Sequence, residues 1–252
     1  TYTEHGMVNP AVYRASTVTY DDVEALHSRK QPYLYGRRGT PTSRAFETAV
    51  AELEGGFDCK ACPSGLAAIS ATLLAFLKTG DHLLMVDTAY HPARQLCDTV
   101  LKGLGIETTY FDPLIGSGIA GLIRPNTRVV YCESPGSQTM EVQDIPAIAH
   151  AAKARGVLTV IDNTWGAGHY FKAFAHGCDV SIQAATKYIV GHSDVMMGTV
   201  TCSEATWPQF RDTYETLGLF AGPDDMYLAL RGLRTLAPPA SSMRRTCGNC
   251  VK

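Results

Sequence analysis

The chain has 252 residues, of which 45% are hydrophobic and 18% charged, and its formal net charge is −2 with the histidines neutral. This composition is typical of a folded globular protein, and the length allows one large domain or two modest ones. No basic surface is implied, so we expect no nucleic-acid partner. No apolar run is long enough to span a membrane and the first residues show no secretory pattern, so we expect a cytoplasmic protein without a membrane partner.

The segment before about residue 45 lacks a periodic pattern. Positions 13–20 are predicted to be extended, and positions 28–42 are basic, aromatic and rich in turn residues. Such a composition favours an arm that reaches another surface over an element of the core. We therefore expect an N-terminal arm over residues 1–44, a large domain over 45–236, and an irregular tail over 237–252.

Between about residues 60 and 200, short apolar runs alternate with helical patterns. We predict helices over 66–77, 93–103 and 145–155, and strands over 82–87, 108–111, 128–132, 157–162 and 180–184. This alternation predicts an α/β fold whose mostly parallel sheet carries helices on both faces. Ligands bind such sheets at the carboxyl ends of the strands, where Asp87, Glu133 and Asp162 fall.

Lys187 is the most informative residue, because it lies between an apolar strand and a Gly-His turn. We expect burial to disfavour its ammonium form, and a neutral amine can form a Schiff base with an aldehyde. Asp162 ends an earlier apolar strand and can form an ion pair with a protonated pyridine nitrogen. Pyridoxal 5'-phosphate (PLP) requires both groups from a protein, so the two residues predict a PLP site.

Four further features suit a phosphate or a flat ring, although each has a simpler structural explanation. Ser64 and Gly65 open an alanine-rich helix, where free N–H groups attract anions, but a plain N-cap has the same sequence. Tyr90 could stack on a cofactor or close the rim of the sheet. Thr186 could donate to a phosphate or satisfy the strand end. The phenol of Tyr35 and the guanidinium of Arg37 also suit a phosphate, or lie solvated in a loop.

The chain contains eight cysteines, four of them in the pairs Cys59/Cys62 and Cys247/Cys250. A structural zinc site needs four ligands, but these pairs lie far apart and have no helical His pair beside them. The other cysteines lie singly in apolar stretches, where a thiol behaves as a small hydrophobic group. We therefore expect reduced thiols and no metal.

Taken together, these motifs resemble the Cys/Met-metabolism PLP-dependent enzymes over about residues 10–236. The resemblance is carried by the segments 35–42, 64–65, 87–90, 133–141, 162–165 and 179–193. It implies a PLP-dependent fold of type I in which Lys187 holds the cofactor, Asp162 contacts its pyridine nitrogen, and Tyr90 stacks on its ring.

Further residue roles follow from the same resemblance. The family's phosphate-binding positions match Ser64, Gly65, Leu66 and Thr186. Tyr35 and Arg37 match residues that reach the phosphate of a neighbouring subunit, so the resemblance implies a homodimer or homotetramer. Ala184 stands where many relatives have a phosphate-binding serine, which removes one such contact. Family chains are also longer, so we expect the small C-terminal domain, with its arginine for the substrate carboxylate, to be missing.

Within the family, two positions favour enzymes that eliminate at Cβ. Relatives of the γ type usually have Tyr-Ser-Arg where this chain has Tyr35-Gly36-Arg37, and Asn where it has Ser137. The implied reaction is cleavage of the Cβ–S bond of a thioether amino acid such as L-cystathionine, with Lys187 and Tyr90 moving protons.

Three alternatives remain open. A cystathionine or methionine γ-lyase would form 2-oxobutyrate, and an inactive PLP-binding protein would act as a regulator or partner. A dinucleotide-binding enzyme is disfavoured because no G-x-G-x-x-G opens a helix after a strand.

Overall fold

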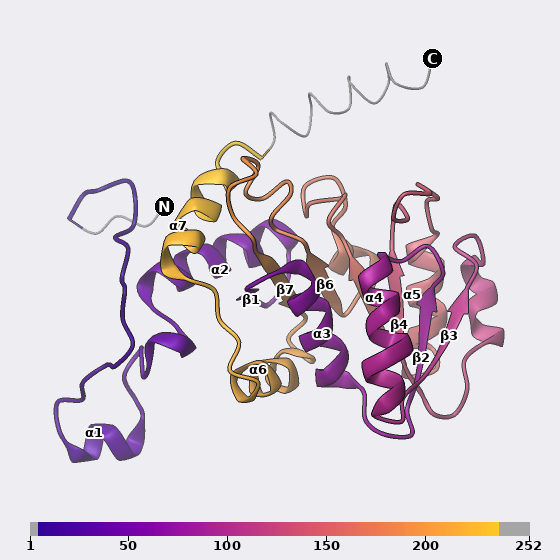
Figure 1. The fold of residues 1–252 in the computed structure, drawn as a ribbon, viewed down its shortest axis with the longest axis horizontal. Coiled ribbons are helices and arrows are strands. Elements are labelled where there is room, and N and C mark those ends of the chain that lie inside the picture. Colours follow the sequence, from indigo (N-terminus) through magenta and orange to yellow (C-terminus); the bar gives the residue numbers. More distant parts are fainter. Residues whose placement is uncertain (1–4, 237–252) are drawn as a thin grey trace.

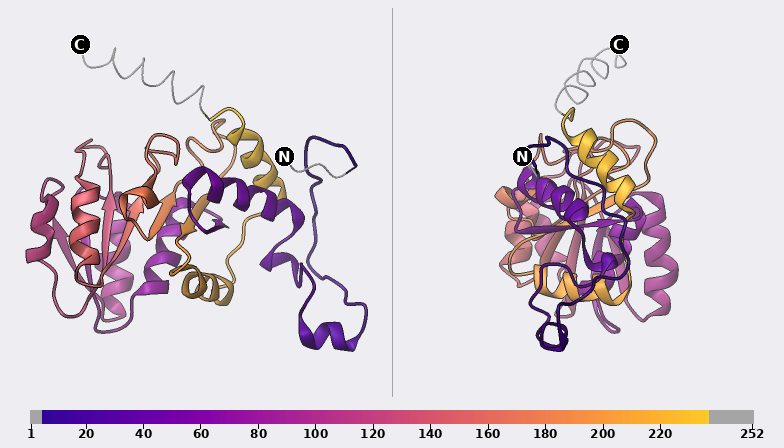
Figure 2. Two further views of the ribbon diagram at one scale, coloured as in Figure 1. Left: turned by 180° about the vertical axis from the view of Figure 1, so that it is seen from behind. Right: turned by 90° about the vertical axis from the view of Figure 1, so that its left-hand side faces the viewer.

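The computed structural model describes residues 5–236, which form one seven-stranded sheet with helices on both faces (Figure 1, Figure 2). The strands are β1 Asp58–Cys62, β2 His82–Val86, β3 Glu107–Phe111, β4 Thr127–Glu133, β5 Leu158–Asp162, β6 Val180–Gln183 and β7 Gly198–Cys202. The α-helices are α1 Val23–Ser28, α2 Pro41–Glu54, α3 Gly65–Phe76, α4 His91–Leu96, α5 Ile145–Lys153, α6 Trp207–Thr216 and α7 Pro223–Leu233. None of the helices in residues 5–236 is long and apolar enough to cross a membrane.

The sheet confirms the predicted α/β fold. Its strand order is β1-β7-β6-β5-β4-β2-β3, and every neighbouring pair from β6 to β3 is parallel. Strand β7 alone runs antiparallel to both of its neighbours, β1 and β6. All five side chains of β2 are buried, as expected for a strand that is covered on both faces.

Most of the predicted elements are present within a few residues of their expected limits, but strands β1 and β7 and helices α1, α2, α6 and α7 were not predicted. Strand β1 contains Asp58 and Lys60, which break an apolar pattern. The core tolerates Lys60 because its Nζ lies 3.3 Å from Glu47 Oε2 on α2. Strand β7 is rich in threonine and glycine rather than in large apolar residues. The predicted helix over 93–103 begins at His91 and continues from Cys97 as a π-helical segment.

The residues before α2 extend away from the sheet (Figure 1). Helix α1 has no buried residue, and the extended segment before it pairs with the following loop through the bridge between Thr17 and Tyr35. Helix α2 begins at Pro41, where the hydroxyl of Thr40 caps the backbone N–H of Ser43. The segment is thus largely exposed, and its role as an arm stays a prediction. The proposed tail over 237–252 lies outside the described residues.

All cysteines within the described residues are free and buried: Cys59, Cys62, Cys97, Cys132, Cys178 and Cys202. Burial raises the pKa of each thiol, so these side chains act as small apolar groups of the core. The other pair with CxxC spacing, Cys247 and Cys250, lies outside the part of the chain that the structure describes.

Gly198, at the start of β7, allows the N-terminus of α3 to lie against the sheet. A Cβ atom on Gly198 would lie 2.3 Å from the carbonyl oxygen of Ser64 and 2.9 Å from Cα of Gly65. We expect Gly198→Ala to destabilise the chain by about 2 kcal/mol, because backbone atoms cannot move aside cheaply. Urea unfolding measures this loss. Gly103→Ala is the control, since a Cβ there meets nothing within 4 Å. Equal stability of the two variants would contradict the packing argument.

Candidate active site

The side chains that predicted a PLP site converge at the carboxyl ends of β4, β5 and β6. Glu133 and Asp162 end β4 and β5, and they are paired across the two strands. Lys187 lies in the turn after β6, where its N–H donates to the carbonyl of Ala184 at 3.0 Å. The turn ends at Gly191, whose φ of 74° is easily adopted only by glycine. The strand ends and this turn therefore bring the amine and both carboxylates to one edge of the sheet.

Asp162 is held by the residues that follow it. Its side chain is buried, and Oδ1 accepts hydrogen bonds from the N–H and the hydroxyl of Thr164 at 3.0 and 2.5 Å. The Thr164 hydroxyl in turn accepts from the N–H of Ala184 at 2.8 Å, which ties the end of β5 to that of β6. Burial raises the pKa of Asp162, while the Thr164 hydrogen bonds and the charge of Lys187 oppose that shift. No donor within residues 5–236 contacts Oδ2, so this oxygen can pair with a protonated ligand nitrogen.

Glu133 belongs to the same site, although the sequence indicated only its place at a strand end. Its Oε2 accepts a hydrogen bond from the backbone N–H of Tyr90 at 2.7 Å, which fixes the loop that carries the Tyr90 ring. Burial and the nearby Asp162 carboxylate raise the pKa of Glu133, and the Tyr90 N–H and Lys187 lower it. Glu133 therefore takes up a proton more readily than an ordinary glutamate, because it is buried beside the Asp162 carboxylate.

Lys187 and Tyr90 face the same space, because Nζ lies 5.8 Å from the centroid of the Tyr90 ring. The expectation that Lys187 is buried is wrong for the part of the chain that the structure describes, because its side chain is exposed. The reason is the cavity beside it, which has a volume of about 720 Å³ and opens to solvent. Thr164, Trp165 and Thr186 also line this cavity. Desolvation of the amine therefore needs another surface or a ligand.

The N-terminus of α3 lies next to this turn. The Ser64 hydroxyl oxygen accepts from the N–H of Ala67 at 3.1 Å, which leaves the hydroxyl proton free to donate. The N–H groups of Gly65 and Leu66 belong to the first turn of the helix and have no intrahelical acceptor. A Cβ on Gly65 would lie 2.9 Å from Cβ of Ala184, so glycine permits this close approach. These donors form a potential anion site next to the segment that carries Lys187.

Three other predicted phosphate ligands, Thr186, Tyr35 and Arg37, have different surroundings from the donors at the N-terminus of α3. The hydroxyl of Thr186 already donates to the carbonyl of Met197 at 3.0 Å and accepts from the Met197 N–H at 2.8 Å. Arg37 lies in the arm, where its Nη1 donates to the carbonyl of Glu215 at 2.8 Å and its guanidinium carbon lies 5.8 Å from the Tyr35 ring. Tyr35 and Arg37 line a separate cavity and are absent from the one beside Lys187.

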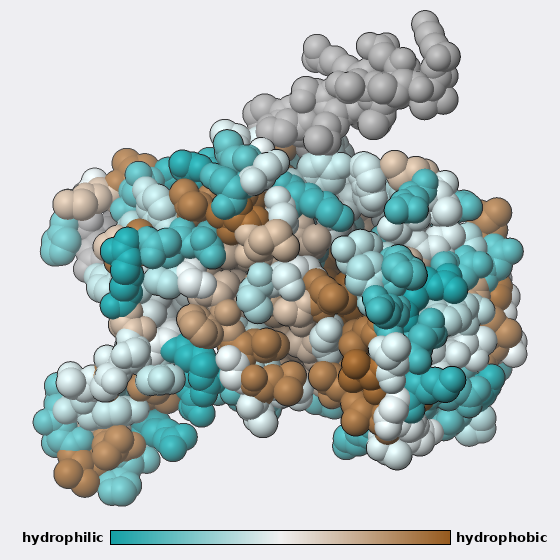
Figure 3. Space-filling model, viewed as in Figure 1, coloured by the Kyte–Doolittle hydropathy of each residue, from teal (hydrophilic) through white to brown (hydrophobic). Residues whose placement is uncertain are grey.

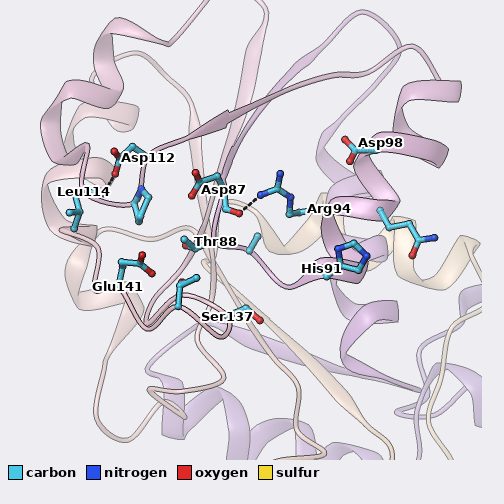
Figure 4. A pocket seen from close by; sticks show the side chains of 13 residues that line it. Asp87, Thr88, His91, Arg94, Asp98, Asp112, Leu114, Ser137 and Glu141 are labelled. Carbon is cyan, nitrogen blue, oxygen red and sulfur yellow. Dashed lines mark hydrogen bonds between the residues drawn. The ribbon is translucent and has the colours of Figure 1, made fainter. Parts of the chain in front are cut away.

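A second cavity, of about 1000 Å³, is lined by Asp87, Thr88 and His91 among other residues (Figure 4). Arg94 donates to the backbone carbonyl of Asp87 there, and its guanidinium carbon lies 4.1 Å from the centroid of the Tyr110 ring. Ser137, which the sequence predicted to differ from γ-type relatives, lines this cavity. Its N–H donates to the carbonyl of Thr88 at 2.8 Å, so Ser137 lies near the site without lining the cavity of Lys187.

The site's donor set fits PLP. Lys187 supplies an amine, Asp162 supplies a buried carboxylate with one oxygen that lacks a donor, and Tyr90 supplies a half-exposed ring. The first turn of α3 supplies N–H groups and a hydroxyl for a phosphate. A cavity of about 720 Å³ lies in the usual range for ligand sites. The class of protein indicated is thus a PLP-dependent enzyme with a parallel α/β sheet.

Comparison with known proteins gives the family. The family model of the Cys/Met metabolism PLP-dependent enzymes matches residues 1–248. The chain is 48% identical to cystathionine beta-lyase of Escherichia coli over 238 residues, which cover 92% of this chain and 60% of the relative. Its identity to cystathionine beta-lyase of Haemophilus influenzae is 47%, with the same coverage.

A solved structure shows the same fold. The cystathionine gamma-lyase from Lactobacillus plantarum, complexed with L-serine, superposes with a TM-score of 0.88 at 32% identity, over 92% of this chain and 60% of that one. The chain therefore belongs to the Cys/Met metabolism family of PLP-dependent enzymes, which confirms the predicted family, fold and cofactor class. It spans about 60% of the length of these relatives.

Proposed function

We propose that this chain provides the cofactor-binding part of a carbon–sulfur lyase that cleaves the Cβ–S bond of L-cystathionine. The products would be homocysteine, pyruvate and ammonia, in a step of methionine biosynthesis. The observation that carries the proposal is the proximity of Lys187 to both the Tyr90 ring and the buried Asp162 carboxylate. The higher identity to cystathionine beta-lyases than to the aligned gamma-lyase supports elimination at Cβ. Reduced, buried thiols are consistent with a cytoplasmic location.

Each part of PLP would have its own contacts in this proposal. Lys187 would hold the aldehyde carbon, Asp162 Oδ2 the pyridine nitrogen, and the Tyr90 ring the face of the cofactor. The phosphate would lie at Ser64, Gly65, Leu66 and Thr186, and Thr186 would exchange its hydrogen bond to Met197 for one to the phosphate. When bound, PLP supplies an electron sink for negative charge at the substrate Cα.

The chain's own residues would move the protons. The amine of Lys187, once it is free and uncharged, takes the proton from Cα of the substrate. The bond between Cβ and sulfur then breaks, and Lys187 or the Tyr90 phenol donates a proton to the departing thiolate. The released 2-aminoacrylate takes up water and gives pyruvate and ammonia. Asp162 stays ionised throughout, so that its charge favours the protonated pyridine nitrogen.

Product analysis tests this function. The chain is supplied with PLP and L-cystathionine, and the keto acid and the thiol are identified by chromatography. We expect pyruvate and homocysteine in equal amounts. Formation of 2-oxobutyrate and cysteine would identify a γ-lyase instead. Bound PLP without any keto acid would favour a regulatory role.

We also propose that the chain acts as a homodimer or homotetramer in which the arm, over about residues 1–44, reaches a neighbouring copy. The arm around α1 extends from the sheet, and Lys187 is left exposed. Hydrophobic residues also gather on the surface around α3 and α6 (Figure 3). A second copy would cover such a surface and would shield the amine from water. Residues 45–236 would form the large domain.

The arm allows a specific test. We expect Arg37→Ala to weaken PLP binding about tenfold or more, because a guanidinium hydrogen bond to a phosphate contributes roughly 1.5–3 kcal/mol. Absorbance titration with PLP measures the affinity, and light scattering measures the mass of the assembly. Lys30→Ala is the control, because Lys30 is an exposed cation on the same arm. A monomer that binds PLP equally well with and without Arg37 would contradict the proposal.

A further inference from the structure

Glu54, the last residue of α2, is a buried carboxyl group behind the candidate active site. It is only 1% exposed, and neither of its oxygens makes a hydrogen bond within the described residues. The loop after β5 closes over it, since a Cβ on Gly168 would lie 3.0 Å from Glu54 Oε1. A buried carboxylate without hydrogen bonds would cost free energy if it were ionised, so the protonation state of Glu54 matters.

The number of hydrogen-bond donors around Glu54 indicates its protonation state. The side chains that interact with its carboxyl are those of Ser181 on β6 and Asn163 after β5. Asn163 Oδ1 and Ser181 Oγ are likewise buried, and neither makes a hydrogen bond. Asn163 Nδ2 donates to the carbonyl of Phe171 at 3.0 Å, which fixes Oδ1 as the atom that needs a donor. If Glu54 were ionised, four oxygens would share the single proton of Ser181.

A neutral Glu54 provides the missing proton. Its hydroxyl can donate to Asn163 Oδ1, and its other oxygen can accept from the Ser181 hydroxyl. Burial raises the pKa of Glu54 to about 7, which agrees with this count. The side chains of Ser181 and Asn163 and the charge of Lys172 lower the pKa, and the charge of Asp162 raises it. The other titratable groups that interact with Glu54 are the buried thiols Cys59 and Cys178.

Asn163 connects Glu54 to the cofactor site. It is fully buried between Asp162 and Thr164, and its N–H donates to the carbonyl of Ile182 at 2.8 Å. Its own carbonyl accepts from the N–H of Ala167 at 2.8 Å, which shapes the turn that carries Trp165. An Asn163 side chain fixed by Glu54 therefore fixes residues on both sides of it, including the Asp162 carboxylate.

We propose that Glu54 is a positioning residue for the PLP site, where its neutral carboxyl donates to Asn163 and accepts from Ser181. This chain of hydrogen bonds holds the segment from Asp162 to Trp165 in place without any contact between Glu54 and a ligand. This role rests on the proposed function, because it assumes that the segment from Asp162 to Trp165 forms part of a PLP site. When Glu54 loses its proton, the donor to Asn163 disappears, so the segment loosens at alkaline pH.

The fluorescence emission of Trp165 reports on this segment in the chain without bound PLP. The chain has two tryptophans, and a Trp207→Phe background leaves the emission of Trp165 alone. We expect this emission to change with a midpoint near the Glu54 pKa of about 7. Glu54→Gln keeps a donor and an acceptor but cannot ionise, so it is expected to abolish the change and retain the acidic spectrum. Persistence of the same pH step in Glu54→Gln would overturn the proposal, even if Glu54→Ala does not fold.

Affinity for PLP provides the second measurement. We expect Glu54→Gln to bind PLP within roughly twofold of the unsubstituted chain, and Glu54→Ala to bind about fivefold more weakly or worse. Glu52→Ala is the matched control, because Glu52 is an exposed carboxylate on the same helix. Equal affinity in Glu54→Ala and Glu52→Ala would contradict a positioning role. If no form of the chain binds PLP, the proposed function fails, while the Trp165 titration still decides the role of Glu54.

Discussion

Replacement of Lys187 by alanine is expected to reduce pyruvate formation from L-cystathionine at least about 1000-fold, because one amine both takes and returns protons in the reaction. PLP itself should still bind, although without a covalent link. In the proposed site its nitrogen would still contact Asp162 and its phosphate would still contact the N-terminus of α3, and neither contact involves the amine. Steady-state assays of pyruvate and absorbance spectra of bound PLP measure the two effects separately.

The matched control for this substitution is Lys153→Ala, since Lys153 is exposed at the end of α5, away from the cavity. It should retain full activity. Near-normal pyruvate formation by Lys187→Ala would show that another group is the base, and the proposed assignment of protons would then be wrong.

Asp162→Asn is expected to lower activity at least about 100-fold while it stabilises the chain without cofactor. The activity falls because an amide cannot form an ion pair with the pyridine nitrogen, and the electron sink is weakened. The stability rises because burial raises the folded-state pKa of Asp162 above its ordinary value. The folded state therefore binds more protons than the unfolded state, and stability decreases as pH rises through the interval between the two pKa values.

At neutral pH the asparagine avoids this cost, and its oxygen can still accept from Thr164, as Oδ1 does in the unsubstituted chain. Urea unfolding across a pH series measures the stability, and pyruvate assays measure the activity. Asp212→Asn, at an exposed carboxylate on α6, should change neither. A destabilised Asp162→Asn chain at neutral pH would contradict the electrostatic argument.

Local sequence patterns predicted the parts of the site that depend on the ends of single elements. Asp162 ends an apolar run, and in a parallel sheet that position lies at the edge where ligands bind. Ser64 and Gly65 open α3 because a hydroxyl cap and a small residue mark a helix start. Lys187 follows a buried strand directly, so its place beside Asp162 follows once the two strands are neighbours.

Features that depend on contacts between distant segments could not be predicted in this way. The exposure of Lys187 depends on what covers the cavity, which the sequence of one turn does not contain. The hydroxyl of Thr186 is occupied by Met197, which belongs to another loop. Glu133 joins the site only because the N–H of Tyr90 is brought to it across the sheet. The missed strand β1 holds Lys60, whose burial is compensated by Glu47 from α2.

The most direct test is borohydride reduction of the PLP-treated chain followed by peptide mapping, because reduction makes the bond between pyridoxal and a lysine amine permanent. We predict that the pyridoxyl group is found on the peptide that contains Lys187 and that it is absent from Lys187→Ala. A pyridoxyl group on another lysine, such as Lys60 or Lys172, or on none, would contradict the assignment of Lys187 as the residue that holds the cofactor.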